Sequence, residues 1–167
     1  SSPNSEGWTI NGDWAWGAPL GGADPEVAKN GSGVAGNVLA SPGVYESFLE
    51  SHMQSPVVDV SGHSTVRLQM HRWLEVEDST FDRAQVLVNG AEVWVNASSF
   101  EGNLNHVDGE WRFQDLDLTP FVQNGQVQLE FILDTDEALE FGGWNLDELC
   151  IVGAGSTSSN LCGDGVV

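Results

Sequence analysis

The chain alternates between apolar and polar residues over short runs that are separated by Gly, Asn, Asp, Ser or Pro. Over residues 66–73 the alternation places one set of side chains on a common face, namely Val66, Leu68 and Met70. A period of two is typical of a β-strand that buries one face. Segments 126–133 and 144–152 are predicted to be strands as well, the first with inward-facing Val127, Leu129 and Phe131.

Two further apolar runs, 84–88 and 91–95, are separated by Asn89 and Gly90. Both turn residues tolerate positive φ, so this dipeptide between strand patterns predicts a tight hairpin. Short strands at such spacing predict an antiparallel all-β sandwich. We expect at most one helical turn, within residues 42–53. Long loops are expected in the Gly-rich first 45 residues, held by packed Trp side chains or a bound metal ion.

Composition narrows the choice of partners. The 167 residues fit one domain with a sizeable core. The chain has 25 Asp and Glu against 5 Lys and Arg, a formal net charge of −20. Because the few cationic side chains are scattered singly, nucleic acid and anionic membrane surfaces are poor partners.

No apolar run approaches the ~20 residues of a membrane-spanning helix, and the N-terminus lacks the charged and then apolar pattern of a signal segment. The chain is therefore either cytosolic or a piece of a secreted protein.

The two cysteines, Cys150 and Cys162, lie near the C-terminus with a Gly/Ser-rich stretch between them. A disulfide between them would close a small loop and contribute about 3 kcal/mol in the chain-entropy picture. The alternative is two unpaired thiols. Only the disulfide would indicate an oxidising compartment.

Several short motifs follow one another in a fixed order over residues 7–152. They are Gly-Trp-Thr (7–9), Trp-x-Trp-Gly-x-Pro (14–19), Tyr45, Ser-Pro-x-x-Asp (55–59), Trp73 with Glu75, Glu77 and Phe81-Asp82, then Trp111, Asp-Leu-Thr (117–119) and Gly-Trp-x-Leu-Asp-Glu-Leu (143–149). In this order they resemble the jelly-roll domain that follows the catalytic domain of immune inhibitor A-type metallopeptidases, which is related in fold to MAM adhesion domains. The resemblance implies a galactose-binding or MAM-like jelly roll.

The last residues, Cys-Gly-Asp-Gly (162–165), resemble the start of the Cys-rich repeats that follow such domains in secreted myxobacterial proteins. This likeness implies a jelly-roll domain over residues 1–153 and a linker with the start of a Cys-rich segment over 154–167. It also implies a larger exported parent protein, in which Cys162 could pair with a cysteine beyond residue 167.

Related folds often hold a structural Ca²⁺ ion where the N-terminal loops meet the last strand. Calcium takes six to eight oxygen ligands from carboxylates, carbonyls and Asn side chains. The resemblance implies Asp147 as a ligand, with possible co-ligands Glu6, Asp13, Asp24 and Asn37. The alternative is that Asp147 caps a turn and the others are solvated. A second acidic cluster, residues 134–137 with Glu140, lacks EF-hand spacing and is interpreted as a solvated loop.

Patterns for catalysis are missing from the sequence. The four histidines have no zinc-binding spacing: His52, His63, His71 and His106. No nucleophile elbow, phosphate loop or Cys with a plausible base occurs. Glycosidases use a pair of carboxylates at a defined separation. Acidic residues are so frequent in this chain that such a pair cannot be identified without the distances between them.

Seven Trp residues invite a sugar-binding interpretation, because pyranose rings stack on exposed aromatic faces. Four of them are expected in the core: Trp8, Trp73, Trp111 and Trp144. The better candidates for a ligand surface are Trp14, Trp16 and Trp94.

The favoured hypothesis is a non-catalytic, calcium-stabilised accessory domain of a secreted bacterial protein, exported and peptidase-like, that serves binding or adhesion. Its partners would be a polysaccharide or a cell-surface protein, and the rest of the parent chain. Two alternatives stay open: a carbohydrate-binding module proper, and a hydrolase that uses acidic residues. Two carboxylates facing each other across a cleft about 5–10 Å wide would favour the hydrolase.

Overall fold

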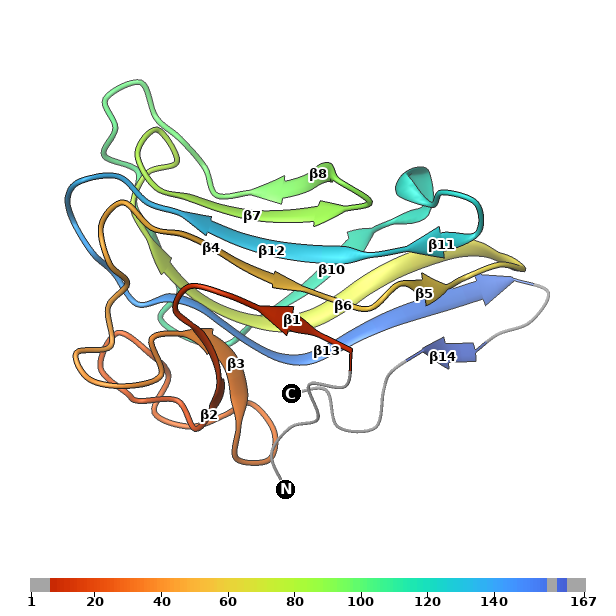
Figure 1. The fold of residues 1–167 in the computed structure, drawn as a ribbon, viewed down its shortest axis with the longest axis horizontal. Coiled ribbons are helices and arrows are strands. Elements are labelled where there is room, and N and C mark those ends of the chain that lie inside the picture. The colour runs from red at the N-terminus through yellow and green to blue at the C-terminus, as the bar shows by residue number, and fades with distance from the viewer. Residues whose placement is uncertain (1–6, 156–158, 162–167) are drawn as a thin grey trace.

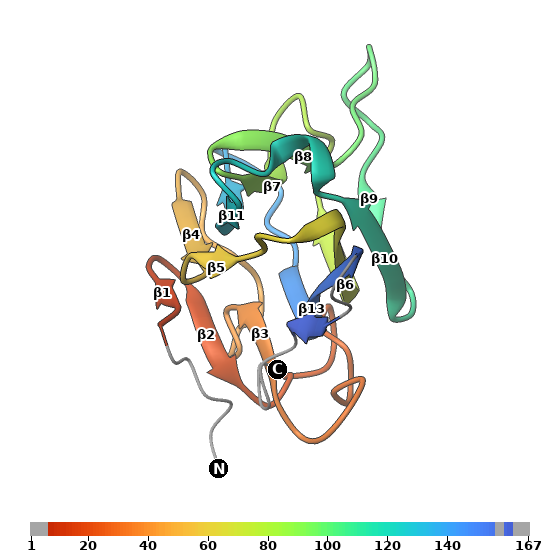
Figure 2. The ribbon, with the colours of Figure 1, turned by 90° about the vertical axis from the view of Figure 1, so that its right-hand side faces the viewer.

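The computed structural model describes residues 7–155 and the backbone of residues 159–161, and it confirms the all-β sandwich. Two antiparallel sheets face each other, as Figures 1 and 2 show. The five-stranded sheet has the order β1 (Thr9–Ile10), β4 (Glu50–Gln54), β12 (Leu129–Asp134), β7 (Arg83–Val88) and β8 (Ala91–Val95).

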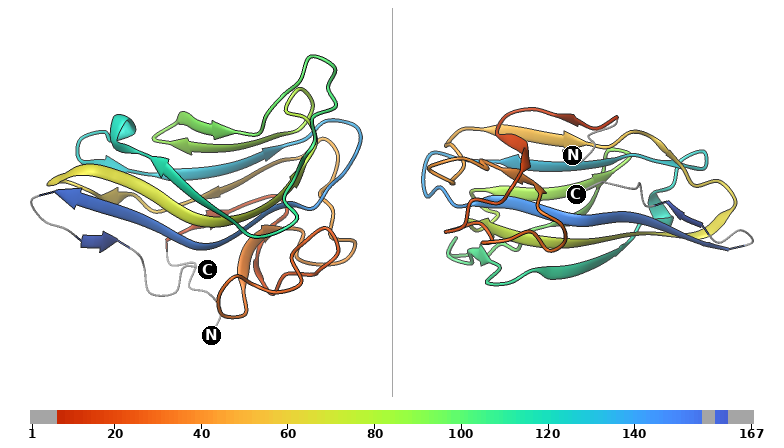
Figure 3. Two further views of the ribbon diagram at one scale, coloured as in Figure 1. Left: turned by 180° about the vertical axis from the view of Figure 1, so that it is seen from behind. Right: turned by 90° about the horizontal axis from the view of Figure 1, so that it is seen from below.

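The seven-stranded sheet has the order β10 (Arg112–Asp117), β6 (His63–Val76), β13 (Gly143–Gly155), β3 (Val34–Asn37) and β2 (Trp14–Gly17). Two more strands join it at the side: β14 (Ser159–Leu161) pairs with β13, and β9 (His106–Val107) pairs with β6. Figure 3 shows β10, β6 and β13 from behind. The remaining elements are the pair β5 (Val58–Asp59) and β11 (Gln126–Val127), and a 3-10 turn at Thr119–Phe121.

Strand β6 confirms the predicted alternation along its length. Its inward-facing side chains are buried, among them Val66, Leu68 and Met70, and they meet the inner face of the other sheet. The same holds for β12, where Leu129 and Phe131 are fully buried. Burial of this apolar face stabilises the fold by roughly 25 cal/mol per Å² removed from water.

The predicted hairpin is also confirmed. Strands β7 and β8 are joined by Asn89 and Gly90, whose φ angles are 51° and 79°. The Asn89 side chain donates hydrogen bonds to the carbonyls of Phe121 and Gln126 and accepts one from Gln128 N. The turn is therefore tied to the connection that precedes β12.

No helical turn forms over residues 42–53, where at most one was expected, and the 3-10 turn lies at Thr119–Phe121 instead. The stretch 42–53 is a loop that continues into β4, which pairs on one side with β1 and on the other with β12. Pairing on both edges outweighs the weak helical preference of the segment.

In the N-terminal region, three short strands form where the sequence predicts loops. Strand β1 extends one edge of the five-stranded sheet, and β3 and β2 extend one edge of the seven-stranded sheet.

The predicted boundary at residue 153 lies near the end of β13, which continues to Gly155. Strand β14, within the predicted linker 154–167, pairs antiparallel with β13. The division into a domain and a Cys-rich start stays a prediction. Among the described residues, no helix is both long and apolar enough to cross a bilayer.

Candidate functional site

Four of the five residues predicted to bind calcium lie in the described part of the chain, and each takes part in a hydrogen bond: Asp13, Asp24, Asn37 and Asp147. Asp147 is buried on β13, and its two carboxylate oxygens accept hydrogen bonds from Asn30 N at 2.8 Å and Glu148 N at 2.6 Å. Asp24 is also buried and accepts from Asn145 Nδ2 at 2.7 Å. Burial raises the pKa of both carboxyl groups, against the lowering effect of these donors. Both residues therefore anchor the N-terminal loops to β13.

Asp13 and Asn37 form a third anchor. Asn37 Nδ2 donates to Asp13 Oδ1 at 2.8 Å, and Asn37 Oδ1 accepts from Trp144 N at 2.8 Å. The other oxygen of Asp13 is buried with no hydrogen-bond partner among the described residues. Burial raises the pKa of the Asp13 carboxyl, against the lowering effect of hydrogen bonds from Ser51 and Asn37. Glu6 lies outside the described residues.

Asp13, Asp24 and Asp147 do not converge on one point. Among the described residues, one group of three or more acidic, His or Cys side chains has its ligand atoms within 4.8 Å of one another, and it contains none of these three. Most of their oxygens already accept hydrogen bonds. The predicted calcium position beside Asp147 therefore has no gathered ligand set in the part of the chain that the structure describes.

The three Trp residues predicted to bind ligand differ in exposure. Trp14 is 5% exposed and belongs to the core. Trp94 faces the space between the sheets, where it meets Trp144 edge-on at 5.5 Å and Arg72 lies over its ring at 4.8 Å. Trp16 is half-buried and meets Trp8 edge-on at 6.1 Å. Trp16 and Trp94 are thus both half-buried and packed against the core, and of the two only Trp94 has a charged side chain over its ring.

Two other Trp residues hold a long N-terminal loop. Trp73 Nε1 donates to the carbonyl of Ala23 and Trp111 Nε1 donates to the carbonyl of Val27, both at 3.1 Å. Their rings meet edge-on at 6.2 Å. Both are half-buried on the outer face rather than in the core, so the core prediction is confirmed fully for Trp144 alone, at 0% exposed. These contacts are the packed Trp side chains expected to hold the loops.

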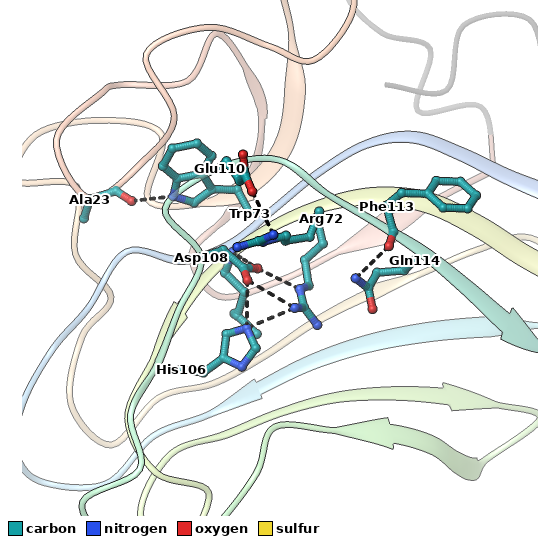
Figure 4. Close-up of polar contacts among 10 residues, drawn as sticks. Ala23, Arg72, Trp73, His106, Asp108, Glu110, Phe113 and Gln114 are labelled. Carbon is teal, nitrogen blue, oxygen red and sulfur yellow. Dashed lines mark hydrogen bonds and ion pairs between the residues drawn. The ribbon is translucent and has the colours of Figure 1, made fainter.

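A buried ion pair lies between the sheets. Arg72 is 6% exposed and points inward from β6, where the alternation predicts an apolar residue. Its Nε donates to Asp108 Oδ2 at 2.9 Å, and its Nη2 lies 3.0 Å from His106 Nε2, as Figure 4 shows. Asp108 also accepts from Leu74 N at 3.1 Å. Burial raises the pKa of Asp108, but the hydrogen bonds from His106 and Arg72 outweigh it and lower the pKa overall.

The gathered acidic group consists of Glu77, Asp82 and Asp136. Glu77 directly follows β6 and Asp82 directly precedes β7, so both lie on the connection that passes from one sheet to the other. Asp136 follows the end of β12, and β12 pairs antiparallel with β7 so that Asp134 lies opposite Arg83. Strand order therefore brings two chain segments that are far apart in the sequence together at one end of the sandwich, on the left in Figure 1.

Hydrogen bonds fix the backbone around this acidic cluster. Asn96 Nδ2 donates to the carbonyls of Glu77 and Asp82, which holds both ends of the connection. Asp82 accepts from Tyr45 Oη at 2.6 Å and from Asp136 N at 2.7 Å. Burial, then the neighbouring carboxylates, raise the pKa of Glu77 and of Asp82 above their ordinary values.

The distances in the acidic cluster bear on the hydrolase alternative. Ligand atoms of all three carboxylates lie within 4.8 Å of one another. Two carboxylates that flank a glycosidic bond stand about 5–10 Å apart. The cluster therefore has the spacing of ligands around one cation rather than that of an acid and a nucleophile.

An open pocket of about 260 Å³ lies on the outer face of the five-stranded sheet and is lined by Thr9, Ile10, Asn11, His52, Gln54 and Glu130. His52 stands between two carboxylates, with Nδ1 at 2.8 Å from Glu130 and Nε2 at 2.9 Å from Glu50. Burial lowers the pKa of His52, but the two carboxylates outweigh it and raise the pKa. The pocket therefore presents amide, imidazole and carboxylate groups around a small hollow.

Cys150 lies half-buried on β13. Its predicted disulfide partner, Cys162, lies outside the described residues, so the disulfide stays a prediction.

The chain is similar in sequence to part of one known protein and in fold to several solved domains. It is 27% identical over 150 residues to bacillopeptidase F of Bacillus subtilis (strain 168), a match that covers 87% of this chain and 10% of that protein. The chain thus spans about a tenth of this relative. No family model matches the chain.

The fold is similar to the K1 cleaved adhesin domain of Lys-gingipain from Porphyromonas gingivalis W83, with a TM-score of 0.55 and 15% identity over 89% of this chain and 92% of that domain. A more distant likeness, with a TM-score of 0.47 and 13% identity, covers 90% of this chain and 97% of the C-terminal CBM6 of LamC from Zobellia galactanivorans. The adhesin comparison confirms the β-sandwich fold. At such identities neither structure indicates a shared ligand.

Sequence reasoning missed the acidic cluster. It treats residues 134–137 as a solvated loop, whereas the structure places Asp136 against Asp82 and Glu77. The available signal was the acidic run at Glu77–Asp82 on a sheet-to-sheet connection. Without the pairing of β7 with β12, that run could not be linked to Asp136.

Proposed function

We propose that this chain is a non-catalytic accessory domain of a longer, secreted bacterial protein of peptidase type, and that it serves binding or adhesion. The observation that carries the proposal is the match to bacillopeptidase F, which takes in 87% of this chain but 10% of that protein. A segment that is alignable over nearly its whole length with a small part of a peptidase has the character of a module. The adhesin-like sandwich supports a binding role.

The surface that best suits a ligand is the pocket beside β1, β4 and β12. Small-molecule sites are concave and carry a few polar groups that orient the ligand. Here Gln54, Asn11 and Glu130 provide amide and carboxylate groups that could bind sugar hydroxyls. This pocket favours a polysaccharide as partner, and it is the specific observation behind the second candidate, a carbohydrate-binding module. A cell-surface protein is the other partner of the main proposal.

Calcium stays part of the proposal as a structural ion. The resemblance led to Asp147, a buried carboxylate whose two oxygens accept hydrogen bonds from Asn30 N and Glu148 N. Asp13, with its unpartnered buried oxygen, is the member of the predicted set that fits an ion best. An ion bound in this region would tie the N-terminal loops to the sheet and would take no part in any bond-breaking step.

Affinity electrophoresis in gels that contain plant, chitin or bacterial polysaccharides tests the binding role. We expect retardation in at least one gel, and its loss in Gln54→Ala. The matched control is Gln114→Ala, because Gln114 lies on β10 of the other sheet and donates only to the carbonyl of its neighbour Phe113. Equal retardation of both variants would rule out the pocket. If no polysaccharide retards the protein but the protein binds intact bacterial or host cells, a cell-surface protein is favoured as the partner.

A further inference from the structure

We propose that Glu77, Asp82 and Asp136 form a binding site for one Ca²⁺ ion. This site differs from the position that the resemblance implies beside Asp147, and it rests on the calcium part of the proposed function. Its three carboxylates come from the end of β6, the start of β7 and the loop after β12, so the ion would join both sheets at one end of the sandwich.

The first support is convergence. Ligand oxygens of all three residues lie within 4.8 Å of one another, and Glu77 and Asp82 are 5% and 0% exposed. Three carboxylates this close repel one another strongly where water is largely excluded. A divalent cation between them would replace this repulsion with attraction.

The second, independent support is the Glu77 carboxylate itself. Glu77 is 5% exposed as a residue, and its side chain makes no hydrogen bond or ion pair with any residue that the structure describes; burial and the carboxylates of Asp82, Asp136 and Asp78 raise its pKa. The adjacent Asp78 is a contrast: its carboxylate accepts hydrogen bonds from Thr80 N, Ser99 N, Ser99 Oγ and Leu104 N. A buried carboxylate without a partner is costly, so such groups are paired or coordinate metals. Glu77 therefore points to a ligand that the protein chain does not supply.

The local framework is prepared for an ion. Asn96 fixes the carbonyls of Glu77 and Asp82 with bonds of 2.8 and 3.0 Å, and Tyr45 Oη holds one oxygen of Asp82. These contacts hold the two backbone carbonyls, and Tyr45 Oη and Asp136 N hold the two oxygens of the Asp82 carboxylate. Ligands with such support bind metal more tightly than free side chains do.

The donor set selects calcium. All three ligands are oxygens, and the cluster contains no His or Cys, which zinc prefers. Magnesium demands near-octahedral geometry and gives up its water reluctantly, whereas calcium accepts six to eight oxygens in flexible geometry. Water and backbone carbonyls would complete the calcium shell.

Isothermal titration with CaCl₂ on the chelator-treated protein tests the site, with melting temperature as a second readout. We expect saturable binding, a higher melting temperature in calcium, and calcium affinity about tenfold or more weaker in Glu77→Gln and in Asp136→Asn, because affinity follows ligand charge. Glu137→Gln is the matched control, since Glu137 is an exposed acid on the same loop. Its affinity should equal that of the unaltered protein. MgCl₂ should bind far more weakly.

Each result decides between the possibilities. Calcium affinity unchanged in Glu77→Gln and Asp136→Asn would overturn the site. If Asp13→Asn or Asp147→Asn alone abolishes binding, the position implied by the resemblance is correct and this proposal is wrong. Absence of any calcium binding by the unaltered protein overturns both calcium positions and leaves the polysaccharide test unaffected. Folding of each variant is verified by its melting transition in EDTA.

Discussion

Two groups of buried charges in this sandwich are built in opposite ways. In one, Arg72 and Asp108 form an ion pair that also receives bonds from Leu74 N and His106. In the other, Glu77, Asp82 and Asp136 bring three charges of one sign together. The first is neutralised within the chain, while the second is left with excess negative charge. A buried charge that is paired within the chain, such as Arg72, is explained by the fold. A buried charge without an opposite charge in the chain points instead to a bound ion.

The largest effect should follow from breaking the complete pair. Asp108→Ala leaves the Arg72 guanidinium buried without a counter-charge, which we expect to lower the free energy of unfolding by about 3–5 kcal/mol, with or without calcium. Urea unfolding measures this loss. Asp115→Ala is the control, because Asp115 pairs with Arg67 on the surface, with side chains 36% and 40% exposed. Exposed pairs contribute about 0–1 kcal/mol. Equal losses in both variants would contradict the contrast.

Acid should weaken the same pair. The pKa of Asp108 is lowered in the folded protein, so its contribution is present above the unfolded value of about 3.9 and is lost as the pH falls through the folded pKa. We therefore expect the stability difference between the unaltered protein and Asp108→Asn to be constant from about pH 5 to 8 and to shrink below about pH 4. Urea unfolding at a series of pH values measures it. If the stability difference between the two proteins grew as the pH falls, the charge of Asp108 would not be what stabilises the folded protein.

An intermediate effect of opposite sign should appear in the acidic cluster. In EDTA, Glu77→Gln removes one of three like charges and breaks no hydrogen bond of the side chain. Two charges 4 Å apart interact by about 4 kcal/mol at an effective dielectric constant of 20, so we expect a partial gain of about 1–3 kcal/mol. Thermal unfolding in EDTA measures it, with Glu137→Gln as the control. Destabilisation by Glu77→Gln would mean that the chain already compensates this carboxylate.

The smallest effect should come from the surface, where water screens the charges. His52 lies between Glu50 and Glu130, and its pKa is raised despite partial burial. A raised pKa gives stability that is present below the unfolded value of about 6.5 and lost as the pH rises through the folded pKa. His52→Gln should therefore cost at most about 1 kcal/mol at pH 5.5 and less at pH 8.5. Denaturant unfolding at both pH values tests this, and equal costs would exclude the charge effect.

Much of the fold could be predicted because it depends on local patterns. Alternation identified β6, β12 and β13, and Asn89-Gly90 identified the hairpin, since side-chain period and turn conformation are properties of a few consecutive residues. The N-terminal strands were not predicted. Strand β3 is only four residues long, contains Gly36 and is buried throughout, so no alternation marks it.

The candidate sites depend on which strands are neighbours, and no local pattern contains that information. Arg72 has a polar side chain at an inward position, and its partner Asp108 follows a two-residue strand far along the chain. Likewise, the contact of Asp82 with Asp136 exists because β12 pairs with β7. Acidic residues are so frequent here that composition could not single out the three that converge.

The pairing of β6 with β13 also determines how this molecule must reach its native state. These strands form the middle of the larger sheet, and Asp147 of β13 lies opposite His71 of β6. Contacts between such distant segments pay the entropy of closing a long loop, and β-sandwiches with such topology fold in about milliseconds to seconds. Until β13 pairs with β6, one long edge of β6 and its apolar face are exposed and can contact other chains. Folding yield should therefore fall with protein concentration, because the slow step leaves time for association.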